Sequence, residues 1–250
     1  MSKLKITFVG HATFLIEMGG EFLLTDPNFS HKILGFSRLQ EPGIRPDTLP
    51  DLNAITVTHA HYDHLDIFSY KYFPLKTPIV VPEGLGKLIN KFLPNPVTEI
   101  LPWSEHQIGN ITIFTVPVKH QGFRLSGLTY RATTGYLFKK DDLSIFFPGD
   151  TAYSEHFAEI AKAHKIDIAL LPIGAYEPRW FMKNRHMNPE EALKAFEDLK
   201  ARIMIPYHWG AFKISAEKPE APLEWLQKIL SEKADERVKI LKPGEFYEEF

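Results

Sequence analysis

The stretch THAHYDHLD, residues 58–66, holds three histidines and two aspartates. The whole chain has 11 histidines in 250 residues, so this concentration stands out. His59 and His61 are two residues apart, and side chains at that spacing in an extended segment point to the same side. Crowding imidazoles together without a cation gains nothing and costs solvation or charge repulsion. The stretch therefore predicts a metal site, with Asp63 and His64 placed where the chain turns into the next element.

A sharp turn after two same-facing histidines would let this segment serve two neighbouring ions. Zinc takes imidazole nitrogen and carboxylate oxygen at about 2.0–2.2 Å, and each ion would need more donors than the segment offers. His120, Asp150 and His208 each follow an apolar run, where loops at a sheet edge would begin. Taken alone, such a histidine is more often an ordinary loop residue, and Asp150 could simply cap a helix. Asp150 could also bridge both ions, since a carboxylate has two oxygens.

The order of β-rich and helical runs occurs twice along the chain. Each half opens with hairpin strands that end in an aspartate, Asp26 in one half and Asp150 in the other, and continues with apolar strands that pass into polar loops. Helices are expected over 83–93, 154–165, 188–200 and 222–234, with Ser154 and Asn188 as N-caps and Pro189 at a first helical position.

These elements predict an α/β fold, because two sheets packed face to face with helices outside would bury both sets of apolar strands. We expect a four-layer αβ/βα sandwich of two similar halves, with the metal site on the sandwich edge. The sequence has no linker or low-complexity segment, so residues 1–250 are expected to form a single domain.

The composition excludes several classes of protein. Apolar residues make up 44% and charged residues 24%, and the formal net charge is −2, so no basic field points to nucleic acid. Disulfides and thiolate metal sites are impossible because the chain has no cysteine, which favours a cytoplasmic location. Apolar runs are too short for a transmembrane segment or a secretory signal. Peripheral membrane contact and the oligomeric state stay open.

The chain resembles the metallo-β-lactamase superfamily of dinuclear metal hydrolases, and within it most closely N-acyl-phosphatidylethanolamine-hydrolysing phospholipase D and its bacterial relatives. The stretches that carry this resemblance are GHATFLIEM, LLTDPNFS, THAHYDHLD, GDTAYSEHF, LLPIGAYEPRWFMKNRHMNPEEA and IPYHWGAFKIS. They run from residue 10 to about residue 215, and the GAYEPRWFM…HMNPEEA run is the most discriminating. The region after His120, QGFRLSGLTYRATT, matches poorly, so activity class transfers better than substrate identity.

The resemblance implies two zinc ions, with manganese or iron as alternatives. The implied ligands of one ion are His59, His61 and His120, those of the other are Asp63, His64 and His208, and Asp150 bridges the two. Asp26 matches an early aspartate that supports the metal-binding histidines. The expected catalytic residues are Asp63, as a ligand of the second ion, and His186, which would contact the phosphate or protonate the leaving oxygen. His186 could otherwise bond a helix cap, and His11 is better explained as a buried hydrogen-bonding group that shapes the floor of the site.

Two further patterns bear on the substrate. Three loops, residues 29–46, 119–131 and 176–187, concentrate basic side chains in a slightly acidic chain, which suits an anionic substrate. Ordinary surface salt bridges would explain the same residues. The apolar loop residues could line an acyl groove, or equally be core or an oligomer contact; they are Ile33, Leu34, Phe36, Leu125 and Leu128.

The leading hypothesis is a zinc-dependent phosphodiesterase of this phospholipase D type, acting on an anionic small molecule or a phospholipid through a hydroxide that bridges the metals. Two ions about 3.5–4 Å apart can lower the pKa of a shared water and neutralise charge at the attacked phosphorus. A lactonase or other C–O or C–N hydrolase of the same fold would need the same metals and is the alternative. The full ligand set argues against a non-catalytic metal-binding module, and the lack of a basic stripe against a nucleic-acid partner.

Overall fold

The computed structural model describes residues 4–122, 124 and 132–250. Its strands are β1 (Leu4–Gly10), β2 (Thr13–Met18), β3 (Glu21–Thr25), β4 (Lys32–Ile33), β5 (Phe36–Ser37), β6 (Ala54–Thr56), β7 (Ile79–Pro82), β8 (Val97–Ile100), β9 (Glu105–Ile108), β10 (Ile111–Val116), β11 (Gly135–Lys140), β12 (Leu143–Phe147), β13 (Ile168–Pro172), β14 (Ile203–Tyr207) and β15 (Phe246–Glu249). Its α-helices are α1 (Gly86–Ile89), α2 (His156–Ala163), α3 (Arg179–Met182), α4 (Pro189–Leu199) and α5 (Ala221–Lys233), and its 3-10 helices are η1 (Pro46–Thr48) and η2 (Ile67–Tyr72).

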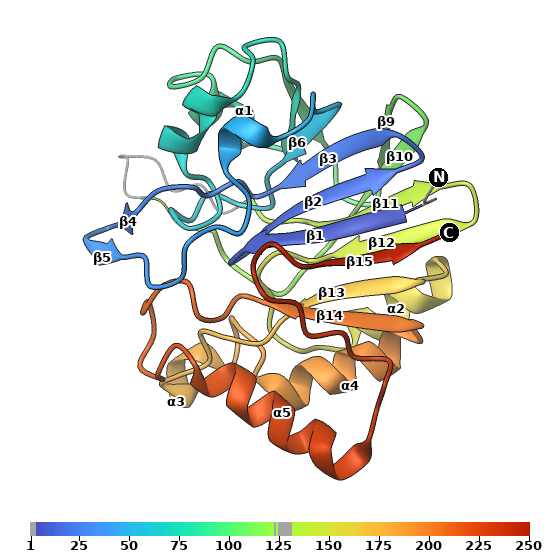
Figure 1. Ribbon diagram of the computed structural model, residues 1–250. Helices are drawn as coiled ribbons and strands as arrows, with labels where there is room; N and C mark the ends of the chain where they lie inside the picture. The colour runs from blue at the N-terminus through green and yellow to red at the C-terminus, as the bar shows by residue number, and fades with distance from the viewer. Residues whose placement is uncertain (1–3, 123, 125–131) are drawn as a thin grey trace.

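Two large sheets form the centre of the molecule (Figure 1). One has seven strands in the order β15-β1-β2-β3-β6-β7-β8, and the other has six in the order β14-β13-β12-β11-β10-β9. The run β1-β2-β3-β6-β7 pairs antiparallel, antiparallel, parallel, parallel, and the run β10-β11-β12-β13-β14 pairs in the same sequence. The two halves therefore share one topology, as the order of elements predicted.

Helices cover the outer faces of the two sheets. Helices α2, α4 and α5 lie beyond the six-stranded sheet, while α1 lies beyond the seven-stranded sheet (Figure 1). Side chains of η2 pack with those of α1 in one apolar core. The main core contains Leu4, Ile6 and Phe8 of β1 together with inward side chains of the second sheet. Alternate residues such as Val9 belong to a second core under α1 and η2. This period of two places one face of β1 between the sheets, and the α/β sandwich is confirmed.

One of the two predicted N-caps, Asn188, is confirmed, and the other, Ser154, is wrong. Asn188 caps α4 with its side chain, which accepts from the Glu191 N–H, while the Glu191 carboxylate accepts from the Asn188 N–H. The prediction of Ser154 as a cap is wrong: α2 begins after Glu155, and the Ser154 hydroxyl contacts His156 Nδ1 rather than a backbone N–H. The predicted helix over 83–93 shrinks to the single turn α1, followed by turn residues.

Loops from both halves lie at one end of the sandwich. In Figure 1 the small β4–β5 hairpin and helix α3 both occupy the left edge, whereas the C-terminus lies at the opposite end. Apolar helices long enough to cross a bilayer are absent from the described residues.

Asn188→Ala should lower the free energy of unfolding by about 1 kcal/mol, because the first turn of α4 loses its reciprocal cap. Urea denaturation followed by circular dichroism measures the change. Glu220→Ala is the matched control, since Glu220 precedes α5 without any side-chain cap bond; it should stay within about 0.5 kcal/mol of the parent. Equal effects of the two substitutions would contradict the capping assignment.

Candidate metal centre

The predicted ligands meet at the sandwich edge although they come from distant parts of the chain. The loop between β6 and η2 supplies four of them, and the segments after β10, β12 and β14 supply one each. Four groups of donor atoms have all their atoms within 4.8 Å of one another, and two of these groups together contain all seven predicted ligands. The first group is His59, His61, His120 and Asp150; the second is His11, Asp63, His64 and His208. The other two groups add Asp26 and His186.

The first group brings three imidazole nitrogens together. His59 Nε2 lies 2.9 Å and His120 Nε2 lies 3.2 Å from His61 Nδ1. His59 Nδ1 contacts the Thr58 hydroxyl at 2.9 Å, and that hydroxyl donates to Asp26, so the His59 proton is on Nδ1. The His120 Nδ1–H donates to the Arg185 carbonyl at 2.9 Å. Lone pairs of Nε2 on both rings therefore face His61, and such an excess of lone pairs suits a cation.

The second group surrounds the Asp63 carboxylate. Asp63 Oδ2 lies 3.4 Å from His208 Nε2 and 3.6 Å from His64 Nε2. Asp150 joins the groups, since its Oδ2 lies 3.6 Å from His59 Nε2 and its Oδ1 lies 3.1 Å from His208 Nε2. Two donors bound to one tetrahedral ion are roughly 3.3–3.6 Å apart, given bond lengths of about 2.0–2.2 Å. The spacing of both groups is close to that value.

Asp26 holds both ends of residues 58–64, the ligand loop, which contains four of the predicted ligands. Its carboxylate accepts from the Thr58 N–H at 2.7 Å, from the Thr58 hydroxyl at 2.6 Å and from His64 Nδ1 at 2.7 Å. The proton on His64 Nδ1 leaves Nε2 facing the second group. Gly149, with φ +64°, approaches Thr58 so closely that a β-carbon would lie 2.5 Å from its Oγ1. A glycine is thus required immediately before Asp150.

Three carboxylates are buried at this edge, those of Asp26, Asp63 and Asp150. Their ion-pair partners are all histidines; among the described residues, no lysine or arginine lies within ion-pair distance of them. Buried charge of one sign needs compensation. Two divalent cations would supply it without protonating the imidazoles.

The protonation equilibria reflect strong coupling between these carboxylates and the imidazoles around them. Burial opposes the charged form of His64, but Asp150 and Asp63 raise its pKa well above the ordinary value. Burial also opposes ionisation of Asp150, yet His208 and His64 hold its pKa well below the ordinary value. Before a cation binds, a proton on His64 is therefore the available positive charge.

The residue types and their unpaired atoms fit a metal ion. His64 Nε2, His208 Nε2 and Asp150 Oδ1 are buried and form no hydrogen bond with the described residues. Buried polar atoms are rarely left unpaired, and these three are nitrogen and oxygen donors that zinc binds. The structure thus brings together all seven predicted ligands, and their role as ligands stays a prediction.

Two histidines outside the seven predicted ligands, His186 and His11, also lie at the centre. His186 Nδ1 is buried, lies 3.9 Å from Asp150 Oδ2 and has no hydrogen-bond partner among the described residues. His11 Nε2 lies 2.9 Å from Asp63 Oδ2. Burial and the neighbouring His208 lower the pKa of His11 to about 3, so its ring is neutral near pH 7. No local sequence pattern signals the contact between His11 and Asp63, which are 52 residues apart.

Several of the basic loop residues have structural partners. Arg38 is buried and donates to the carbonyls of Asn28 and Ser30. Arg124 donates to the Leu65 carbonyl at 2.6 Å, and Arg179 pairs with Glu191. These guanidinium groups therefore stabilise loops, and the interpretation of all three loops as an anion-binding field is too broad. Arg131, Leu125 and Leu128 lie outside the described residues.

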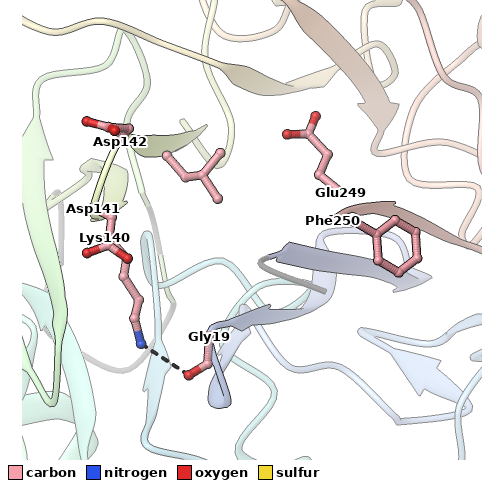
Figure 2. Close-up of a pocket in the computed structure, with 7 residues that line it drawn as sticks. Gly19, Lys140, Asp141, Asp142, Glu249 and Phe250 are labelled. Atoms are coloured by element: carbon pink, nitrogen blue, oxygen red, sulfur yellow. Dashed lines mark hydrogen bonds between the residues drawn. The ribbon is translucent and has the colours of Figure 1, made fainter. Parts of the chain in front are cut away.

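Two cavities differ in chemistry. The one in Figure 2, lined by Gly19, Asp141 and the C-terminal residues, contains no histidine, and its Lys140 is held by Glu21 and the Met18 and Gly19 carbonyls. A second cavity, of about 260 Å³, adjoins the metal centre and is mostly apolar. We call it the apolar pocket; its lining is Ile33, Leu34, Phe36, His61, Tyr62, Asp63 and Ile214.

Curated relatives match over nearly the whole chain. N-acyl-phosphatidylethanolamine-hydrolyzing phospholipase D 1 of Caenorhabditis elegans is 36% identical over 94% of this chain and 72% of its own length. A metal-dependent hydrolase of Pyrococcus furiosus, of the group UPF0173, is 31% identical over 98% of this chain and 99% of its own.

Residues 22–209 match the family described as Beta-lactamase superfamily domain. Among solved structures, the metallo-β-lactamase fold protein YhfI of Bacillus subtilis superposes with a TM-score of 0.71 at 16% identity, covering 99% of this chain and 100% of the other. That similarity establishes the fold, and the sequence relatives establish the class. The chain therefore belongs to the β-lactamase superfamily and is a metal-dependent hydrolase with the metallo-β-lactamase fold.

Proposed function

We propose that this hydrolase is a zinc-dependent phosphodiesterase that cleaves anionic, acyl-bearing phosphodiesters of the N-acyl-phosphatidylethanolamine type. The observation that carries the proposal is the position of the apolar pocket, which shares His61 and Asp63 with the donor groups. A substrate with a phosphate at the donor groups could place an apolar chain in that pocket. The identity to the phospholipase D of Caenorhabditis elegans supports the same substrate class.

The proposed ligands divide between two ions. His59, His61 and His120 would hold one, Asp63, His64 and His208 the other, and Asp150 would be shared. When bound, two such ions supply an activated water and positive charge opposite the phosphoryl oxygens. The chain's own contribution is to hold the rings, through Thr58 for His59, Asp26 for His64 and the Arg185 carbonyl for His120.

His186 is proposed to act on the substrate rather than as a required ligand. Its ring centroid lies 5.0 Å from that of His120 and 5.6 Å from that of His208, so it borders both donor groups. Its loop is held by Arg179, which donates to the His186 carbonyl at 3.0 Å. A neutral imidazole held there could donate a hydrogen bond to a phosphoryl oxygen, and the imidazolium formed when an anionic substrate approaches could pass its proton to the leaving oxygen.

Removing the ligand Asp63 should separate metal binding from folding. Asp63→Ala should reduce bound zinc from about two ions per chain to about one, and phosphodiester turnover should fall roughly 10³-fold as the second ion's charge stabilisation is lost. The chelator-treated protein should still unfold cooperatively but at a lower melting temperature, because the substitution removes the carboxylate partner of His11 and His208 and leaves both apolar cores intact. Elemental analysis, a nitrophenyl phosphodiester assay and calorimetry measure the three quantities.

Asp51→Ala, which removes an exposed aspartate, is the matched control and should leave all three quantities unchanged. Full zinc content in Asp63→Ala would remove Asp63 from the ligand set. Rapid opening of a lactone by the parent protein, without any chelator-sensitive phosphodiester hydrolysis, would replace the phosphodiesterase proposal with a lactonase.

His186→Ala should keep its zinc and its melting temperature but lose about 10²–10⁴-fold in turnover on phosphodiesters with alkoxide leaving groups. A nitrophenolate leaving group needs little protonation, so the loss on that substrate should be smaller. His31→Ala removes an exposed histidine and serves as the control. Equal losses on the two substrates would indicate phosphate positioning, and lost zinc would make His186 a ligand.

The apolar pocket should matter for long acyl chains alone. Phe36→Ala removes an aromatic side chain from its wall and should lower kcat/KM roughly tenfold for a long-chain phosphodiester, through lost apolar contact. The value for a short water-soluble phosphodiester should not change. Trp180→Ala removes an exposed aromatic residue of α3 that does not line this pocket. If both substitutions act equally on both substrates, the pocket does not bind the acyl chain.

A further inference from the structure

His11 has an unusual backbone conformation. It lies in the tight turn between β1 and β2, is buried, and has φ +56°, a left-handed conformation that costs a side-chain-bearing residue free energy. Glycine would adopt this conformation without that cost. Strained non-glycine residues persist where the side chain has a use, so the imidazole of His11 needs an explanation.

The contacts of His11 converge on the second donor group. Its Nε2 lies 2.9 Å from Asp63 Oδ2. Its carbonyl accepts from the His208 N–H at 3.1 Å, and its ring centroid lies 4.2 Å from that of His208. Asp63 belongs to the first half of the chain and His208 to the second. His11 therefore touches the two donors that close this group from opposite halves.

The hydrogen bond defines the tautomer of His11. Its Nδ1 is buried and has no hydrogen-bond partner among the described residues, so a proton on that atom would be an unsatisfied donor. A proton on Nε2 is instead donated to Asp63. Nε2 then has no lone pair for a cation, whereas Asp63 Oδ2 keeps a further lone pair and lies 3.6 Å from His64 Nε2 and 3.4 Å from His208 Nε2. This arrangement makes His11 a holder of a ligand rather than a ligand.

We propose that His11 is a positioning residue that orients the Asp63 carboxylate and thereby sets the affinity of the second metal ion without changing that of the first. The inference rests on the ligand assignment proposed above. Partners that orient a ligand in this way typically contribute about 10–100-fold in metal affinity. The first donor group has no hydrogen bond to His11, so its affinity should be independent of this residue.

A pair of amide variants tests the geometry. In His11→Gln the side-chain nitrogen takes nearly the place of Nε2 and can still donate to Asp63. In His11→Asn the nitrogen takes nearly the place of Nδ1, which faces no partner. Asparagine tolerates the left-handed conformation better than glutamine does. Metal affinity should therefore be higher in His11→Gln than in His11→Asn. The metal-free protein should instead be more stable as His11→Asn than as His11→Gln.

The two dissociation constants of zinc are measured by competition with a chromophoric chelator, and the unfolding of the metal-free protein by urea. In His11→Asn the weaker constant should rise about 10–100-fold while the tighter one stays fixed. His11→Gln should recover most of the loss even though its metal-free form is the less stable. Unchanged affinity in His11→Asn, equal weakening of both ions, or an affinity order that follows stability would overturn the proposal.

The tautomer of His11 can be measured in the unmodified protein, so this test does not depend on the folding of a variant. A long-range ¹H–¹⁵N spectrum should show His11 as the neutral tautomer with its proton on Nε2. A proton on Nδ1 would overturn the positioning role while leaving the ligand set intact. Fewer than two ions bound by the parent protein would instead defeat the ligand assignment and this inference with it.

Discussion

The rest of the site depends on one constraint: Asp26, Asp63 and Asp150 are buried at the same edge. Among the described residues, their ion-pair partners are all histidines. A low-dielectric environment makes three such carboxylates costly without positive charge nearby. Neutral histidines do not supply that charge, and protonated ones would repel one another. Divalent cations resolve the conflict, since they bind the carboxylates and the imidazole lone pairs at once.

The surrounding protein fixes where each lone pair points. Thr58, Asp26 and the Arg185 carbonyl each hold a ring through Nδ1, so Nε2 of His59, His64 and His120 faces the centre. Close approaches make this possible, as at Gly149, which leaves room for the Thr58 hydroxyl. Backbone strain accumulates in the same place: His11, Asp26 and His208 all have positive φ. The orientation of the donors is maintained by the fold rather than created by the cation.

Much of the fold could be predicted from the sequence because strands of period two and capped helices leave local patterns. The cap at Asn188 is an example, since both of its hydrogen bonds join it to Glu191, three residues later. Ser154 shows the limit: its hydroxyl has a competing neighbour, His156 Nδ1, which no propensity rule includes. Helix α1 is shorter than predicted because the residues after it form turns. A helical sequence pattern does not distinguish such turns from a continued helix.

The candidate site was predictable to the extent that its donors are close in sequence. His59, His61, Asp63 and His64 lie in one loop, whereas His120, Asp150 and His208 could be connected to them only through their positions after strands and through family resemblance. The contact of His11 with Asp63 spans 52 residues and follows from how the β1–β2 turn meets the ligand loop. The burial of Arg38 likewise depends on tertiary packing, so charge patterns overstated the basic surface.

The split of donors between the two halves has a consequence for the newly made chain. During synthesis His59, His61 and His120 are added well before Asp150, and His208 is added only after the whole of β14. A partly synthesised chain can therefore offer three imidazoles to one ion but cannot yet complete the shared centre. Under the proposed assignment, loading of both ions is an event of the nearly finished polypeptide, and it can take place only after the second sheet has closed against the first.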